Sequence, residues 1–216
     1  AAHSVRKHQS KGLSTMPDII LHKYDTSPFS EKVRICFGIK SLAWRAAAQP
    51  VIMPKPDLIP LTGGYRRIPV LQIGADIYCD SALIVRELDR RFPEQPLYPA
   101  SNPGLANAIE QWADKGLFQS AVLAIFGSIG EGVDPAFIKD REALSGQPFN
   151  VAAMKALAPF ALTKFGAAAL LAQQLEDDRA FLNGDAPCLG DAAAYYNFWF
   201  LRTFCPGLAD RFEDIA

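Results

Sequence analysis

Ser27 is the first residue whose type and position suggest chemistry, because it stands before a proline in "TSPFSEKVRICFG". A serine there is a common helix cap, since its oxygen accepts a backbone N–H. The free amides of a helix start also stabilise an anion, and a hydroxyl among them can donate a hydrogen bond to a thiolate. No histidine and aspartate are arranged to make Ser27 a nucleophile. Alone, the pattern favours capping.

Each of two later residue pairs can likewise be explained either by local structure alone or by ligand binding. In "RRIPVL", Pro69 either begins a strand as an ordinary trans proline or follows Ile68 in cis geometry. The cis form would present the backbone N–H and C=O of Ile68 to an extended, peptide-like ligand. Asp80 and Ser81 open a helix, where Asp80 is a plain N-cap or the binder of an ammonium group. In the second case Ser81 and the helix amides would bind a carboxylate.

The hydrophobic pattern predicts α/β elements around these pairs and helices beyond them. A continuous helix is expected over 152–182, with Pro159 in its first turn or at a kink. A hairpin is expected where "PVLQIG" meets "ADIYC". The full set of expected elements is strands at 18–24 and 43–52, one irregular turn after 52, the hairpin strands, and helices at 28–38, 81–91, 105–126, 135–144, 152–182 and 189–204.

The domain boundaries follow from this pattern and from composition. We expect an extension or tag over 1–17, an α/β domain over 18–94, a proline-rich linker over 95–103 and an all-α domain over 104–216. The chain stops soon after the last predicted helix, so the second domain is either truncated there or lacks a tail.

The composition excludes several classes of function. The 216 residues are half hydrophobic and carry a net charge of −1, so no field attracts nucleic acid or acidic lipid. No apolar stretch is expected to reach the ~18 residues of a membrane span, because charges and a proline interrupt the richest candidate, 152–175. Four separated cysteines and three histidines predict no metal site and favour a reducing, cytoplasmic compartment.

The order of these motifs resembles the glutathione S-transferase family, in its serine-type, bacterial-like form. The resemblance covers about 18–204 as an organisation and is specific in "SPFSEKVRICF", "RRIPVLQIGADIYCDSALIVREL" and "FPEQPLYP". It implies a thioredoxin-like α/β domain that binds glutathione, followed by an all-α helical-bundle domain that completes a pocket for a hydrophobic electrophile. Glutathione is then a co-substrate, no metal is needed, and a homodimer is expected.

The resemblance also implies roles for individual residues. Ser27 is the catalytic residue facing the glutathione sulfur, with Ser30 as a second-ranked support and Tyr24 as a weaker rival. The remaining glutathione-binding residues are Ile68, whose backbone pairs with the cysteinyl part, the cis-proline Pro69, the γ-glutamyl binders Asp80 and Ser81, and Arg67 near the glycyl carboxylate.

The electrophile pocket is less well defined by the pattern. Trp112, Phe118 and Phe126 are candidates to line it, although aromatic residues on a long helix are more often core. Residues 129–149 are expected to form its variable wall or lid. One departure from the family is Cys188, which stands where a hydroxyl usually caps the last helix. Asp191 is still expected to accept a backbone N–H there.

The expected reaction is transfer of glutathione to an electrophilic carbon, in the service of detoxification. Isomerisation of a glutathione adduct and reductive removal of a halide are alternatives within the family. Disulfide chemistry is disfavoured, because Ser27 has no thiol. A binding module of the same fold without enzymatic activity is the alternative from another class.

Overall fold

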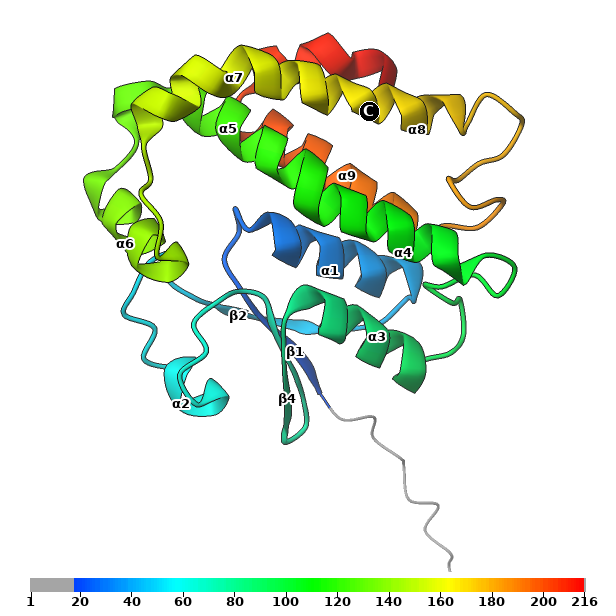
Figure 1. The fold of residues 1–216 in the computed structure, drawn as a ribbon. Helices are drawn as coiled ribbons and strands as arrows, with labels where there is room; N and C mark the ends of the chain where they lie inside the picture. Colours follow the sequence, from blue (N-terminus) through cyan, green and yellow to red (C-terminus); the bar gives the residue numbers. More distant parts are fainter. Residues whose placement is uncertain (1–17, 216) are drawn as a thin grey trace, which may run out of the picture.

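The structure, a computed structural model, describes residues 18–215, with side chains to Phe212 (Figure 1). The predicted extension over 1–17 lies outside these residues. The first elements form a four-stranded sheet with the order β2-β1-β3-β4. β1 is parallel to β2 and antiparallel to β3, and β3 forms the predicted hairpin with β4. The strands are β1 (Ile19–Lys23), β2 (Arg45–Ala48), β3 (Val70–Ile73) and β4 (Asp76–Cys79).

Two helices lie side by side on this sheet, α1 (Pro28–Ile39) and α3 (Ser81–Arg91), as Figure 1 shows. Their apolar stripes and the inward faces of β1 and β3 form one core, in which Val33, Leu71 and Leu88 are fully buried. The predicted irregular turn is α2 (Ile59–Thr62). The arrangement is a thioredoxin-like domain, and its two main helices match the predicted positions to within one residue.

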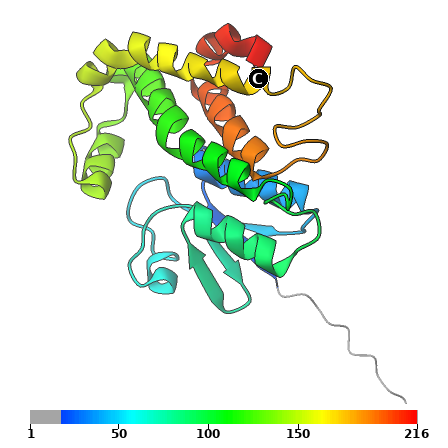
Figure 2. The same cartoon turned by 45° about the vertical axis from the view of Figure 1, so that its right-hand side comes forward.

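The second half of the described chain is helical (Figure 2). α9, the predicted last helix, is the central one, because it packs against α1, α4 and α5 and buries ten of its sixteen residues. The helices are α4 (Pro103–Trp112), α5 (Phe118–Ile129), α6 (Pro135–Ser145), α7 (Val151–Phe165), α8 (Ala169–Gln173), α9 (Leu189–Phe204) and α10 (Pro206–Ala209). Short 3-10 turns lie at 130–132, 166–168 and 210–215.

Two expectations about these helices were wrong, and a third was confirmed. The long helical stretch predicted over 105–126 is helical throughout, as α4 and α5 joined by a π-helical turn, Ala113–Leu117. The helix predicted over 152–182 ends at Gln173, because the following "QLEDDRAFLNGD" is polar and offers no apolar face to pack. Pro159 lies in the interior of α7 and not in its first turn, and the carbonyl of Lys155, which loses its helical partner there, belongs to an exposed residue.

α7 and α8 bear on the expectation that no apolar stretch of the chain reaches the length of a membrane span. Among the described residues, the stretch Val151–Gln173 is long and apolar enough, by length and composition, to cross a bilayer. This is weak support for a span, since core helices of other proteins meet the same criterion. In this structure α7 packs along α5. A Cβ added at Gly127 would lie 2.7 Å from the carbonyl oxygen of Met154, so the two backbones approach closely.

Candidate active site

Three segments meet at one edge of the sheet because of its strand directions. β1 ends at Lys23 and leads into Ser27, while β3 begins at Val70, directly opposite His22. β4 ends at Cys79, directly opposite Val70, and leads into Asp80. Residues 27, 68–69 and 80–81 are therefore brought to the same edge, although more than fifty positions separate the first from the last.

The Ser27 hydroxyl lies in the first turn of α1. Ser27 is the N-cap, with Pro28 directly after it, and its Oγ accepts the backbone N–H of Ser30 at 3.2 Å. The Oγ of Ser30 lies 2.9 Å from the same oxygen and donates to it. Both serines are almost completely buried, with exposed fractions of 2% and 1%. The capping function is thus confirmed. The hydroxyl proton of Ser27 has no acceptor among the described residues.

The Ile68–Pro69 bond is cis, as predicted. Pro69 is buried and Ile68 is half-buried. Neither the N–H nor the C=O of Ile68 has a hydrogen-bond partner within residues 18–215, so both remain free for a ligand. Arg67, the looser candidate, is exposed and donates from Nη2 to the carbonyl of Leu144 on α6 at 3.4 Å.

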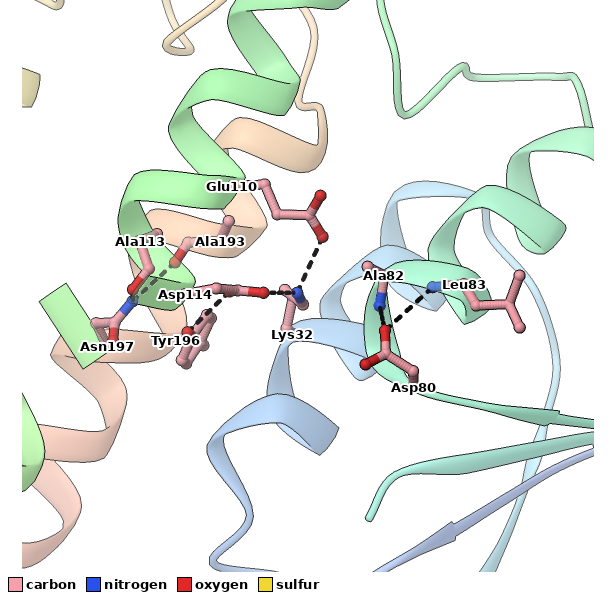
Figure 3. A network of polar contacts seen from close by, with 10 residues as sticks. All are labelled: Lys32, Asp80, Ala82, Leu83, Glu110, Ala113, Asp114, Ala193, Tyr196 and Asn197. Carbon is pink, nitrogen blue, oxygen red and sulfur yellow. Dashed lines mark hydrogen bonds and ion pairs between the residues drawn. The ribbon is translucent and has the colours of Figure 1, made fainter. Parts of the chain in front are cut away.

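Asp80 and Ser81 begin α3 at this edge. Oδ1 of Asp80 accepts the N–H groups of Ala82 at 2.8 Å and Leu83 at 3.4 Å, as Figure 3 shows. Its backbone has a φ of 80°, which is uncommon for a residue other than glycine. The side chain is exposed and its second oxygen is not used in the cap, whereas Ser81 is buried. Asp80 therefore acts as an N-cap and still has one carboxylate oxygen for an ammonium group.

The three aromatic candidates for the electrophile pocket lie in different places. Phe118 packs on Phe29, two residues after Ser27, with ring centroids 4.7 Å apart. Phe126 belongs to another cluster, with Phe137 of α6 at 5.5 Å and Phe149 at 5.0 Å. Trp112 faces α7, in a hollow that it lines with Phe160. The structure thus places Phe118 near the first turn of α1 and Phe126 against α6. Trp112 lies at neither place.

α6 is fastened to the thioredoxin-like domain, which no pattern in the sequence indicated. Nη2 of Arg66 lies 2.5 Å from Oδ1 of Asp140, whose side chain is only 8% exposed. The same carboxylate oxygen accepts the N–H of Met53 at 3.0 Å, and Arg141 donates to the carbonyl of Val51 at 2.8 Å. We call this set of contacts the α6 clasp. It joins the predicted lid to the segments before α2 and before Ile68.

A buried ion cluster on α1, also missed from sequence, joins the two halves of the chain. Nζ of Lys32 donates to Glu110 at 3.0 Å and to Asp114 at 2.6 Å, and the hydroxyl of Tyr196 donates to Asp114 at 2.9 Å (Figure 3). Burial alone would lower the pKa of Lys32, but the two carboxylates outweigh it and raise this pKa. Lys32 and Glu110 are completely buried, so the pairing is structural.

The protein's own thiols are poor nucleophiles. Burial raises the pKa of Cys36 to about 12 and that of Cys188 to about 11. Cys79 precedes Asp80, and burial together with that carboxylate raises its pKa as well. Because the thiolate is the reactive form, a thiolate at this edge has to arrive with a ligand. Asp191 does accept the N–H of Cys188, at 2.9 Å, as expected.

No group of three or more His, Cys, Asp or Glu residues in the described part of the chain could hold a metal ion. The edge is therefore composed of hydroxyls, free backbone groups, helix starts and one carboxylate. Groups of these kinds can bind and polarise a zwitterionic, peptide-like ligand, and the Ser27 hydroxyl can donate a hydrogen bond to a charged atom of such a ligand.

The comparisons with known proteins agree with this geometry. Residues 21–96 match the family described as "Glutathione S-transferase, N-terminal domain", and 121–213 match a domain of unknown function, DUF7962. A solved GST-like protein from Pseudomonas syringae is 36% identical, with a TM-score of 0.66, over 93% of this chain and 64% of that one. A zeta-class glutathione S-transferase of Euphorbia esula is 28% identical over 130 residues, 55% of either chain.

A third relative shows the fold alone, because its identity is 20%. It is the maleylacetoacetate isomerase from Anaeromyxobacter dehalogenans 2CP-1, with bound dicarboxyethyl glutathione and citrate, at a TM-score of 0.59 over 92% of this chain and 85% of that one. The chain spans about half the length of the curated Euphorbia relative and less than two thirds of the Pseudomonas protein. The matched family, the solved relatives and the fold together show that residues 21–96 are a glutathione S-transferase N-terminal domain and that the described chain has the fold of that family.

Proposed function

We propose that the protein is a glutathione transferase that binds glutathione at the sheet edge and stabilises its thiolate for attack on an electrophilic small molecule. The observation that carries the proposal is the meeting of Ser27, the cis Ile68–Pro69 bond and Asp80–Ser81 at one edge. Each group matches a part of glutathione. Ile68 offers backbone groups to the cysteinyl part, Asp80 and Ser81 face the γ-glutamyl zwitterion, and Ser27 faces the sulfur.

The mechanism follows from the acidity of a thiol. A free thiol has a pKa near ~8.5, so it is mostly protonated at neutral pH. A hydrogen bond from Ser27 and the dipole of α1 both favour the thiolate over the thiol. Each ~1.4 kcal/mol of such preference lowers the pKa of the thiol by about one unit. The thiolate attacks the electrophilic carbon, the C–S bond forms as the bond to the leaving group breaks, and the leaving group departs with that electron pair.

The electrophile is proposed to lie between the first turn of α1 and α6. Phe118 supports this position from the side of Phe29, and Phe126 from beneath α6. Arg67 is proposed for the glycyl carboxylate, which it would reach from its exposed position beside α6. Trp112 is the weakest of the proposed pocket residues, because its ring faces α7.

The test combines binding and turnover. Glutathione binding is measured by titration calorimetry, and turnover is measured with a panel of aryl halides, epoxides and activated alkenes. Ser27→Ala should retain binding, but raise the pKa of the bound thiol by one unit or more and lower turnover about tenfold or more. Asp80→Asn should weaken binding itself. Ser120→Ala is the matched control, because Ser120 is buried in α5 and bonds only the carbonyl of Gly116.

Two outcomes would replace this proposal. Absence of glutathione binding at millimolar concentration would exclude both the transferase and a glutathione-binding module. Binding without turnover of any electrophile would favour the non-enzymatic module.

Isomerisation of a glutathione adduct is the second candidate reaction, because one relative of the same fold is an isomerase with a glutathione derivative bound. In an isomerisation glutathione is regenerated, so the substrate would disappear without consumption of free thiol. Reductive removal of a halide, the third reaction expected within the family, would release halide ion and oxidise two glutathione molecules to the disulfide. Transfer to an aryl halide also releases halide but leaves a glutathione adduct, so assays of thiol, halide and glutathione disulfide on the same samples separate the three. A homodimer, a cytoplasmic location and a role in detoxification stay with the proposal as predictions.

A further inference from the structure

We propose that Ser30 is a positioning residue that acts through Ser27, by directing the one free proton of the Ser27 hydroxyl toward the ligand. This inference rests on the proposed function, since it assigns Ser30 a task in holding the glutathione thiolate. It starts from two buried hydroxyl oxygens 2.9 Å apart at the site edge.

The hydrogen bonds of Ser27 can be counted completely. A serine hydroxyl has two lone pairs and one proton. The N–H of Ser30 occupies one lone pair of the Ser27 oxygen, and the O–H of Ser30 occupies the other. Both acceptor positions are filled by one neighbour, so the Ser27 proton cannot turn toward α1. No other partner of this hydroxyl lies within residues 18–212, and the proton is left for a ligand.

Ser30 is the third residue of α1, a position from which a polar side chain can turn back to the N-cap residue. Ser30 is 1% exposed and donates to the side chain of Ser27. The result is a chain of two hydroxyls, in which Ser30 donates to Ser27 and Ser27 donates outward. Such chains polarise each bond in turn, so the outer hydroxyl becomes a stronger donor.

The size of the effect follows from this count. A hydroxyl proton has three staggered positions, and removal of the Ser30 hydroxyl frees one that was blocked. The loss of polarisation adds to this, so Ser30→Ala should lower the thiolate-stabilising effect of Ser27 about two- to fivefold. The apparent pKa of the bound thiol would then rise by about 0.3 to 0.7 units. The backbone N–H of Ser30 remains, so the helix cap is preserved.

The experiment is a double-mutant cycle on the enzyme with glutathione bound. The pKa of the bound thiol is read from the ultraviolet absorbance of the thiolate as a function of pH, for wild type, Ser27→Ala, Ser30→Ala and the double variant. Ser120→Ala again serves as the control, and a thermal melt of each variant records its folding. Positioning predicts that Ser30→Ala raises the thiol pKa, that Ser120→Ala does not, and that the shift from Ser30→Ala disappears when Ser27 is already alanine.

Each outcome has a defined meaning. If Ser27→Ala raises the pKa and Ser30→Ala does not, the positioning role is overturned and the proposed function stands. If Ser30→Ala shifts the pKa equally in both backgrounds, it acts independently of Ser27, which also overturns the proposal. If Ser27→Ala leaves the pKa unchanged, the proposed contact between Ser27 and the sulfur fails, and the role of Ser30 fails with it.

Discussion

The first turn of α1 and the ion cluster that begins at Lys32 lie within one turn of each other on the same helix, yet they are built in opposite ways. The first turn contains two neutral hydroxyls and leaves one proton unpaired. The ion cluster contains one ammonium and two carboxylates, and the Lys32 ammonium donates to both. The first arrangement leaves one hydrogen-bond donor without a partner among the described residues, whereas in the second the charges pair with one another and hold α1 against α4 and α9.

Lys55 adds a third case to this comparison. It is nearly as buried as Lys32, with an exposed fraction of 3%, but its ammonium donates to the carbonyl of Pro50 and has no carboxylate within ion-pair distance among the described residues. Burial and the neighbouring arginine Arg141 lower its pKa to about 8. The two carboxylates beside Lys32 thus favour its charged form and raise its pKa, whereas Lys55, which forms no ion pair among the described residues, has a lowered pKa.

The largest predicted effect is on the ion cluster. Lys32→Met leaves Glu110 and Asp114 without their counter-charge, and should lower the free energy of unfolding by about 3–5 kcal/mol. Chemical denaturation measures this loss, with Lys139→Met as the control because Lys139 is exposed on α6. Equal stability of the two variants would show that the cluster does not hold the halves of the chain together.

A smaller loss of stability is expected when only the hydrogen bond from Tyr196 to the same cluster is removed. Tyr196→Phe keeps the buried ring but removes the hydrogen bond to Asp114, and should destabilise the protein by about 2 kcal/mol. Tyr195→Phe is the matched control, since Tyr195 lies next in sequence and is 49% exposed. The comparison is made by thermal denaturation, and a control that loses as much stability as Tyr196→Phe would contradict the assigned hydrogen bond.

At the first turn of α1 we expect a small loss of stability together with a large loss of activity. Ser27→Ala removes an N-cap and should lower the free energy of unfolding by only about 1 kcal/mol, although it should impair turnover severely. Asn150→Ala removes the N-cap of α7, which accepts the N–H of Ala153 at 2.9 Å. This control should lose similar stability and no activity. If both variants lose activity in proportion to stability, Ser27 is a cap and nothing more.

The last prediction concerns the pH dependence of stability and separates the two lysines. The pKa of Lys55 falls from 10.5 to about 8 on folding, so between these values the unfolded chain binds the extra proton. Stability should therefore rise with pH from 8 to 10.5 in wild type relative to Lys55→Met. The raised pKa of Lys32 predicts that its contribution is fully present below 10.5 and is lost only at higher pH. Urea unfolding of both variants across this range measures the two slopes, and parallel slopes would refute the distinction.

The sequence was a good guide wherever function and fold depend on neighbouring residues. Ser27 with Pro28, and Asp80 with Ser81, are helix starts whose caps can be predicted from a few positions, and both caps are present. The cis geometry before Pro69 is also present, but it followed from the family resemblance, because the motif alone did not favour it. The assignment of these residues to parts of glutathione stays a prediction.

What the sequence did not indicate depends on contacts between distant residues. Lys32 meets Glu110 across 78 positions, and Arg66 meets Asp140 across 74. Periodicity identified 135–144 as helical, but a period of 3.6 residues does not say which domain a helix touches. The helix predicted over 152–182 was too long, because the apolar composition of 152–173 was extended into the polar stretch that follows Gln173.

The α6 clasp has a consequence for the size of substrate the pocket admits. If the electrophile lies between the first turn of α1 and α6, as proposed, a molecule too bulky for that space must displace α6 and separate Arg66 from Asp140. The side chain of Asp140 is almost fully buried, so this separation carries an electrostatic penalty as well as a steric one. Selection by bulk would then depend on the charges of Arg66 and Asp140, and removal of either charge should relax it, which a pocket bounded only by phenylalanine rings would not show.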